Sequence, residues 1–158
     1  MSNKIKPGDP LPDVTLPAQS GEMVRLWDLV GDRRLVIFFY PMDASPVCTR
    51  EACAFRDSYT SLRELGADVV GISPDSPESH SSFAGNYDLP FLLLSDIKGE
   101  AARQFGISGL WKVLTGRVTY VADEAGIVRE VYSSPFRAAK HVETARKALE
   151  DMATGGAD

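Results

Sequence analysis

The sequence predicts an α/β fold in which a mixed central sheet is flanked by helices. Two observations lead to this prediction. Strand-like and helix-like segments alternate through the first part of the chain, and two strand-like segments around a turn then precede a final amphipathic segment. Alternation indicates parallel strands joined by right-handed crossovers, whereas the two strands around a turn indicate an antiparallel hairpin.

The centre of the sheet is predicted at residues 34–40, which read RLVIFFY. A continuous apolar run rich in β-formers is typical of a parallel strand buried on both faces. A helix is predicted next, at residues 47–65, with Gly66 as its C-terminal stop. Its one-sided stripe consists of Cys48, Ala52, Phe55, Tyr59 and Leu62, the spacing of an amphipathic helix.

The remaining elements are predicted from the spacing of their apolar residues and from the turn residues between them. We expect a strand at 68–73, a helix at 77–87, a strand at 91–94, a short helix at 100–105, strands at 117–122 and 127–132, and a helix at 138–152. The thioredoxin-like architecture is the simplest fit, as a single domain spanning residues 1–158. Residues 1–20, with four prolines, are expected to be an extended N-terminal segment or a small edge hairpin, and residues 154–158 a frayed tail.

Composition narrows the classes of function. The 158 residues contain 17 Lys and Arg against 22 Asp and Glu, a net charge of −5, with no basic run. Nucleic-acid and membrane partners are therefore disfavoured. The first ten residues lack the apolar core of a signal peptide, which favours a cytoplasmic location. His80 and His141 lie outside any ligand-like spacing with the cysteines, so no metal is expected.

Cys48 lies where a helix begins. Ser45 can serve as the N-cap, Pro46 suits the first helical position, and Cys48 is then the third residue, among backbone N–H groups that lack intrahelical partners. The positive end of the helix dipole predicts a pKa below that of a free thiol. A small hydrophobic residue on the buried stripe is the competing interpretation, although the rigid loop around Pro41 favours a preorganised site.

The segment YPMDASPVCTREACAFRD, residues 40–57, resembles the active-site signature of the peroxiredoxin family. It is most similar to the bacterioferritin-comigratory or Q-type branch. Pro41, Ser45 and Cys48 fill the three slots of the family pattern, and the resemblance continues through GISPDSPESHSSFA, FLLLSD and RVTYVADEAG. It implies that Arg117, at the start of a hairpin strand, is a further catalytic residue.

The resemblance implies a thiol-dependent peroxidase that needs no cofactor. Cys48 would attack a hydroperoxide and become a sulfenic acid. Pro41 would shield that intermediate, while Ser45 and Arg117 would polarise the two peroxide oxygens. Two residues depart from the family pattern. Val47 replaces the usual Gly and places a side chain beside the expected peroxide entrance, and Ser45 replaces the commoner Thr but keeps its hydroxyl.

Cys53 follows Cys48 by five residues, which in an intact helix means about 7.5 Å of rise and roughly 140° of rotation. The two sulfurs cannot bond unless the first turns unwind. The resemblance implies that Cys53 resolves the sulfenic acid as an intramolecular disulfide, after local unfolding, and that thioredoxin reduces it. The alternative is a passive Cys53 and an external resolving thiol.

Other interpretations stay open at this stage. A disulfide reductase on the same fold would carry C-x-x-C, whereas the spacing here is C-x-x-x-x-C, and a non-catalytic redox sensor is compatible with the sequence. The segment 107–116 contains Trp111 and Leu114, which either border the site or pack on the core. The resemblance favours a monomer.

Overall fold

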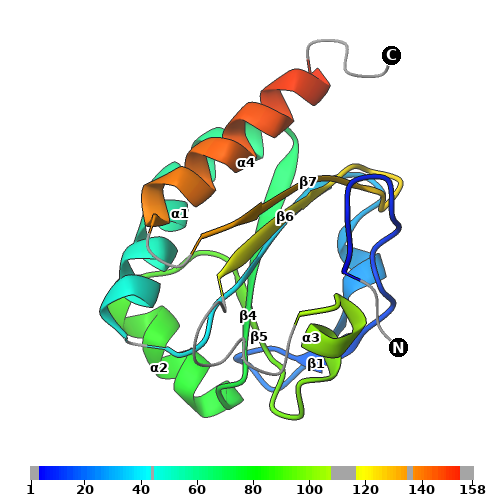
Figure 1. Cartoon of the computed structure of the whole chain (residues 1–158). Coiled ribbons are helices and arrows are strands. Elements are labelled where there is room, and N and C mark those ends of the chain that lie inside the picture. Colours follow the sequence, from blue (N-terminus) through cyan, green and yellow to red (C-terminus); the bar gives the residue numbers. More distant parts are fainter. Residues whose placement is uncertain (1–3, 44, 108–116, 135–136, 154–158) are drawn as a thin grey trace.

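Five strands form the central sheet in the computed structural model, which describes residues 4–43, 45–107, 117–134 and 137–153. The strand order is β5-β4-β3-β6-β7 (Figure 1). Strands β3, β4 and β5 run parallel, whereas β6 is antiparallel to β3 and β7 is antiparallel to β6. The predicted mixed sheet, its central strand and its terminal hairpin are therefore confirmed.

The elements lie close to their predicted positions. The strands of the sheet are β3 (Arg34–Phe39), β4 (Ala67–Ser73), β5 (Leu92–Ser95), β6 (Val118–Ala122) and β7 (Val128–Ser133). The α-helices are α1 (Pro46–Glu64), α2 (Pro77–Tyr87), α3 (Glu100–Gln104) and α4 (Ala138–Ala153). No predicted end differs from the observed one by more than one residue, and such differences are expected where helices and strands fray.

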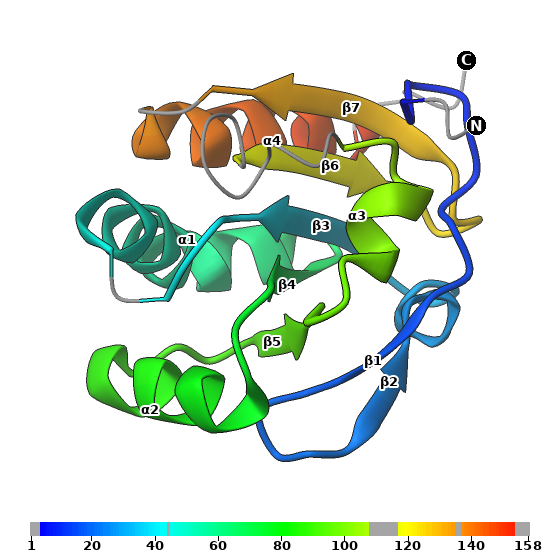
Figure 2. The ribbon, with the colours of Figure 1, turned by 60° about the horizontal axis from the view of Figure 1, so that its bottom comes forward.

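The sheet separates two hydrophobic clusters (Figure 2). On one face, α1, α2 and α4 bury Val36, Phe38 and Tyr40 of the central strand and its extension. On the other face, α3 and the N-terminal segment cover the alternate residues of the same strand. A strand covered on both sides needs apolar residues at every position, which explains the run RLVIFFY.

The N-terminal segment forms an edge hairpin of its own. Strand β1 (Thr15–Pro17) pairs with β2 (Met23–Arg25), and a short 3₁₀ helix, η1 (Leu26–Leu29), follows. The hairpin therefore extends beyond residue 20, where the prediction ended it, and η1 was not predicted. The frayed tail predicted at 154–158, and Trp111 and Leu114 in the segment 107–116, lie outside the described residues.

Candidate active site

Cys48 occupies the first turn of α1, as predicted. Ser45 is the N-cap, and its side-chain oxygen accepts a hydrogen bond from the backbone N–H of Cys48 at 3.3 Å. Pro46 begins the helix. The Cys48 side chain is only 1% exposed and lies on the face of α1 that packs against the sheet.

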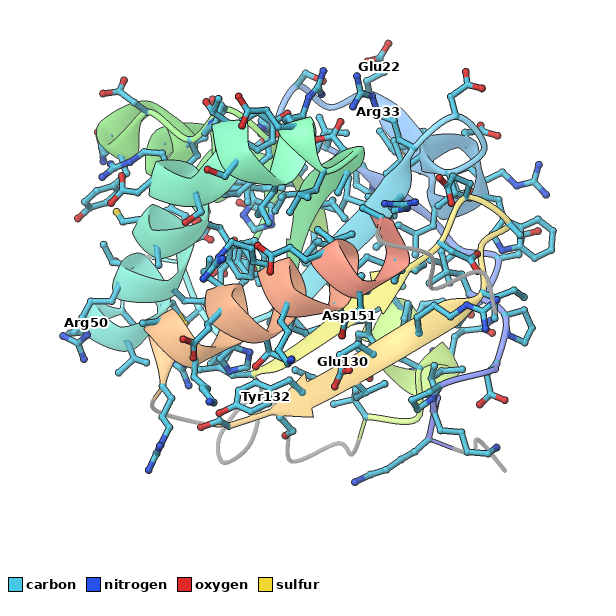
Figure 3. The ribbon with its side chains drawn as sticks, turned by 90° about the horizontal axis from the view of Figure 1, so that it is seen from above. Glu22, Arg33, Arg50, Glu130, Tyr132 and Asp151 are labelled. Atoms are coloured by element: carbon cyan, nitrogen blue, oxygen red, sulfur yellow. The ribbon has the colours of Figure 1, made fainter. Side chains whose placement is uncertain are left out.

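Arg117 reaches Cys48 from the opposite half of the chain. Arg117 immediately precedes β6. Val118, the first residue of β6, pairs with Phe39 at the carboxyl end of β3, close to the start of the loop that leads to Cys48. The Nη2 atom of Arg117 lies 3.1 Å from the Cys48 Sγ. The side chain is buried, whereas Arg50 extends outward from α1 (Figure 3). Without the resemblance to the peroxiredoxin family, the sequence did not distinguish Arg117 from Arg50 as a candidate catalytic residue.

The pKa of Cys48 differs from the prediction. Burial raises it, and this outweighs the opposing effects of the Ser45 hydroxyl, a backbone hydrogen bond from Met42 and the positive charge of Arg117. The prediction of a pKa below that of a free thiol is therefore wrong for this conformation. It considered the helix terminus but not the near-complete removal of the sulfur from water, which penalises the charged form.

The loop between β3 and α1 is anchored by a buried network around Asp43. One Asp43 oxygen accepts a 2.6 Å hydrogen bond from the Tyr40 hydroxyl. The other lies 2.8 Å from His80 Nδ1 and accepts from the Ser79 hydroxyl at 2.8 Å. The backbone N–H of Asp43 donates to Asp75 at 2.7 Å. These bonds from Tyr40, from Asp75 and from α2 hold the loop that leads to Cys48, and they were not predicted from the sequence.

Asp43, Asp75 and His80 also offer potential metal-ligand atoms within 4.8 Å of one another. Those atoms already take part in the network: Asp75 Oδ2 accepts from the Ser73 hydroxyl at 2.6 Å, and His80 Nε2 lies 3.0 Å from the carbonyl oxygen of Leu94. A buried polar cluster that is satisfied internally has a structural explanation. The expected absence of a metal stays a prediction.

Pro41 and Cys53 stand apart from the contact between Cys48 and Arg117. Pro41 is half-buried two residues after the end of β3, in the loop that leads to Ser45. Cys53 is half-buried in the continuous helix α1, and both cysteines are free thiols. Because the helix is intact, the structure does not bring the two sulfurs together.

Two further ionisable residues, not predicted from the sequence, interact electrostatically with Cys48 and Arg117. Glu51, three residues after Cys48, is fully buried. His141 of α4 is also fully buried, and its Nδ1 lies 3.5 Å from a Glu51 oxygen. A signal was present for Glu51, since a residue three positions after Cys48 falls on the same helix face. Nothing in the sequence pairs it with His141.

Comparison with known proteins now adds to this geometry. The AhpC/TSA family profile matches residues 7–131, which is most of the chain. The chain belongs to the AhpC/TSA family. Among curated relatives, peroxiredoxin Q of the Sedum lineare chloroplast is 45% identical over 150 residues, covering 94% of this chain and 80% of that protein. The Arabidopsis thaliana peroxiredoxin Q, also chloroplastic, is 43% identical over 93% of this chain and 68% of its own length.

Solved structures agree with this assignment. Peroxidoxin BcpB from Mycobacterium tuberculosis is 39% identical with a TM-score of 0.87, covering 94% of this chain and 98% of that one. A Xanthomonas campestris peroxiredoxin Q structure gives a TM-score of 0.82 at 27% identity, covering 93% and 98%. The chain is thus a Q-type peroxiredoxin with a thioredoxin-like fold and is a thiol-dependent peroxidase, as the resemblance implied.

Among the described residues, no helix has the length and apolar character needed to cross a membrane.

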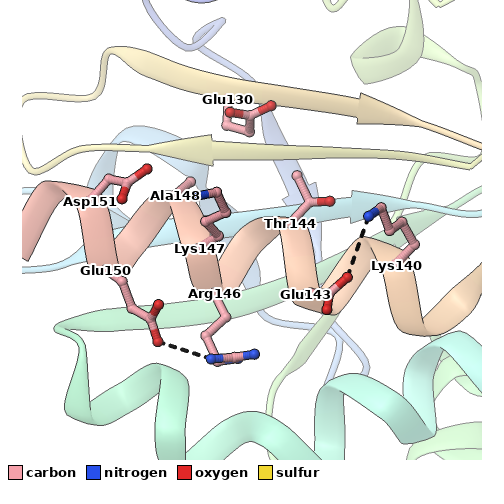
Figure 4. A pocket seen from close by; sticks show the side chains of 9 residues that line it. All are labelled: Glu130, Lys140, Glu143, Thr144, Arg146, Lys147, Ala148, Glu150 and Asp151. Carbon is pink, nitrogen blue, oxygen red and sulfur yellow. Dashed lines mark hydrogen bonds and ion pairs between the residues drawn. The ribbon is translucent and has the colours of Figure 1, made fainter.

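A groove between α4 and β7 lies apart from the candidate active site. It is lined by nine residues, mostly charged, which include the ion pairs Lys140–Glu143 and Arg146–Glu150 (Figure 4). None of the five predicted site residues lines that groove.

Proposed function

We propose that this peroxiredoxin reduces hydrogen peroxide and organic hydroperoxides through Cys48, with Cys53 as its resolving cysteine. The observation that carries the proposal is the 3.1 Å contact between Arg117 Nη2 and Cys48 Sγ inside a buried site. A guanidinium at that distance stabilises the thiolate and leaves further N–H donors for a peroxide oxygen.

The first step is nucleophilic attack by the sulfur. The Cys48 thiolate forms a bond to the terminal peroxide oxygen as the O–O bond breaks, and the leaving oxygen takes the electron pair and a proton to become water or an alcohol. Sulfur is oxidised to the sulfenic acid and the peroxide is reduced. Ser45 and Arg117 hold the peroxide oxygens as negative charge develops on the leaving one. Pro41, half-buried in the loop that leads to Ser45, limits the access of water.

Resolution requires the start of α1 to unwind. Over residues 46–53 the buried side chains are those of Cys48, Glu51 and Ala52. Exposing the two small ones costs about 1 kcal/mol each. Phe55 is the first large buried residue of α1, and its ring stacks on Phe38 with centroids 4.6 Å apart. Unwinding can therefore stop before Phe55 and leave the core intact.

The disulfide then forms by condensation. The Cys53 thiol attacks the sulfenic sulfur, an S–S bond replaces the S–O bond, and water leaves. An external dithiol of the thioredoxin type reduces the disulfide by exchange, which returns both thiols. A one-cysteine cycle resolved by an external thiol is the alternative, and the half-buried position of Cys53 in intact α1 is the observation that favours it.

A thioredoxin-coupled assay tests the proposal. NADPH oxidation is followed after adding hydrogen peroxide to wild type, Cys48→Ser and Cys53→Ser. We expect turnover in wild type and none in Cys48→Ser. Cys53→Ser should form the Cys48 sulfenic acid with one molecule of peroxide and, without a resolving thiol, be oxidised by a second one to the sulfinic acid. Absence of peroxide-dependent turnover in wild type would refute the peroxidase cycle with this reductant.

Mass spectrometry separates the two ways of resolving Cys48. Oxidised wild type should contain an intramolecular Cys48–Cys53 disulfide. Finding instead a sulfinic acid on Cys48, with Cys53 still a free thiol, would remove Cys53 from the cycle. Full coupled turnover by Cys53→Ser would lead to the same conclusion.

Cellular location and assembly belong to the same proposal. The sequence favours a monomeric single domain in the cytoplasm, whereas the similar plant proteins are named chloroplastic. Analytical ultracentrifugation of the reduced and oxidised chain tests the monomer, and cell fractionation tests the location.

A further inference from the structure

Glu51 is a buried carboxyl group that lacks the hydrogen bonds such a group normally makes. It is fully buried in α1, and neither of its oxygens has a hydrogen-bond partner among the described residues. Such surroundings strongly favour the neutral acid over the ionised carboxylate. In agreement, burial raises the pKa of Glu51 to about 8, although the charge of Arg117 opposes the shift.

His141 presents its Nδ1 atom to both the Thr119 hydroxyl and the Glu51 carboxyl group. Its Nε2 lies 2.9 Å from the carbonyl oxygen of Ser134, which can only accept, so Nε2 carries a hydrogen. Nδ1 lies 2.7 Å from the Thr119 hydroxyl and 3.5 Å from Glu51 Oε2. Burial, and secondarily the charge of Arg117, lower the pKa of His141, whereas the bond to Ser134 raises it. A neutral imidazole thus faces the carboxyl group.

The pair has two arrangements of a single proton. With the proton on Glu51, the Thr119 hydroxyl donates to His141 Nδ1. With the proton on His141, Nδ1 donates to the same hydroxyl oxygen, which rotates to accept. In both arrangements the charges of Glu51 and His141 sum to zero. Only loss of the shared proton leaves a net negative charge in the interior. The pair is therefore built to retain that proton.

Retention of the proton matters because Arg117 is shared. Its Nη2 contacts the Cys48 sulfur, and its Nε is buried without a hydrogen-bond partner among the described residues. One guanidinium cannot compensate two anions in a buried site, and ionised Glu51 raises the pKa of Cys48. Among the described residues, Tyr132 of β7 is a further ionisable group that packs against the pair, and its ring meets that of His141 edge-on with centroids 4.7 Å apart.

We propose that Glu51 and His141 form a buried pair that keeps one proton between them, so that Arg117 serves the Cys48 sulfur and not the Glu51 carboxylate. Both act as positioning residues, through Arg117. The inference rests on the peroxidase function proposed above and deepens it, because it assigns to the pair the control of thiolate formation.

Thiolate titration tests the pair directly. The thiolate absorbance of Cys48 is followed against pH in a Cys53→Ser background, which leaves a single thiol. Glu51→Gln carries no charge at any pH and resembles the protonated carboxyl, so the midpoint should stay close to that of the Cys53→Ser parent. His141→Asn offers an amide N–H that stabilises ionised Glu51, so the midpoint should rise. Glu64→Gln, an exposed carboxyl on the same helix, should leave it unchanged.

The combined variant distinguishes coupling from a merely structural role. In the Glu51→Gln background, His141→Asn should no longer move the midpoint. An equal shift in both backgrounds would overturn the proposal, and so would a midpoint that Glu51→Gln alone clearly lowers, because that fall would show Glu51 to be ionised when the thiolate forms. If His141→Asn does not fold, as judged by circular dichroism, His141→Gln takes its place. Peroxide turnover of the wild type is measured alongside, and its absence would refute the peroxidase cycle instead of the pair.

Discussion

Replacing Arg117 by methionine should slow the reaction with peroxide by on the order of 10²- to 10⁴-fold. The 3.1 Å contact to the Cys48 sulfur is a charge-assisted hydrogen bond, and such bonds contribute about 1.5–3 kcal/mol each. In the proposed mechanism Arg117 makes a second such bond, to a peroxide oxygen. Two bonds therefore correspond to about 3–6 kcal/mol, with roughly one factor of ten for each 1.36 kcal/mol.

The measurement is a stopped-flow, single-turnover rate constant for reduced protein with hydrogen peroxide at pH 7, so that no reductant enters the rate. Arg50→Met is the matched control, because Arg50 is exposed on α1 (Figure 3). It should react at the wild-type rate. An Arg117→Met rate within about threefold of wild type, in a protein with an unchanged circular dichroism spectrum, would refute the reasoning; the threshold corresponds to less than one hydrogen bond.

Three further predictions concern the scaffold. Gly71→Ala would place a Cβ 2.8 Å from a ring carbon of Phe38 and should cost about 1–3 kcal/mol in urea unfolding; Gly85→Ala, with open space around it, should cost nothing, and equal losses would contradict the packing argument. Asp43→Ala removes the acceptor beside His80 and the Tyr40 hydroxyl, so unfolding free energy should fall by about 3–5 kcal/mol; a loss below 1 kcal/mol would show the network to be dispensable. Burial raises the pKa of Asp123, but hydrogen bonds from Ile127, Arg129 and Ala125 hold it below its usual value. The ionised Asp123 carboxylate therefore stabilises the fold above the unfolded-state pKa, and this contribution is lost as pH falls. Asp123→Ala should lower the unfolding free energy more at pH 7 than at pH 2.5, and a larger loss at pH 2.5 would exclude a stabilising role of the carboxylate.

The sequence predicts the local part of the site well. Ser45 and Pro46 are cap and first-turn residues whose preferences act over a few positions, so the start of α1 and the third-residue place of Cys48 could be read directly. The central strand was equally clear, because burial on both faces forces an uninterrupted apolar run. Both are confirmed in β3 and α1.

The parts that depend on tertiary packing could not be predicted in the same way. Arg117 is 69 residues from Cys48, and its contact follows from the pairing of β6 with β3. The buried pair of Glu51 and His141 requires α1 to lie against α4. The pKa of Cys48 was mispredicted for a similar reason: the effect of the helix terminus is local, whereas the desolvation that outweighs it comes from the assembled core.

The separation of Cys48 from Arg117 along the chain has a consequence during synthesis. A ribosome that has completed β3, α1 and β4 has already made the cysteine but not the arginine, which follows after α2, β5 and α3. Until β6 docks against β3, the thiol lacks the guanidinium that binds a peroxide oxygen in the proposed mechanism, and it is therefore less reactive toward peroxide than in the finished fold. The order of the elements thus delays peroxide sensitivity until the chain can also enclose the sulfur.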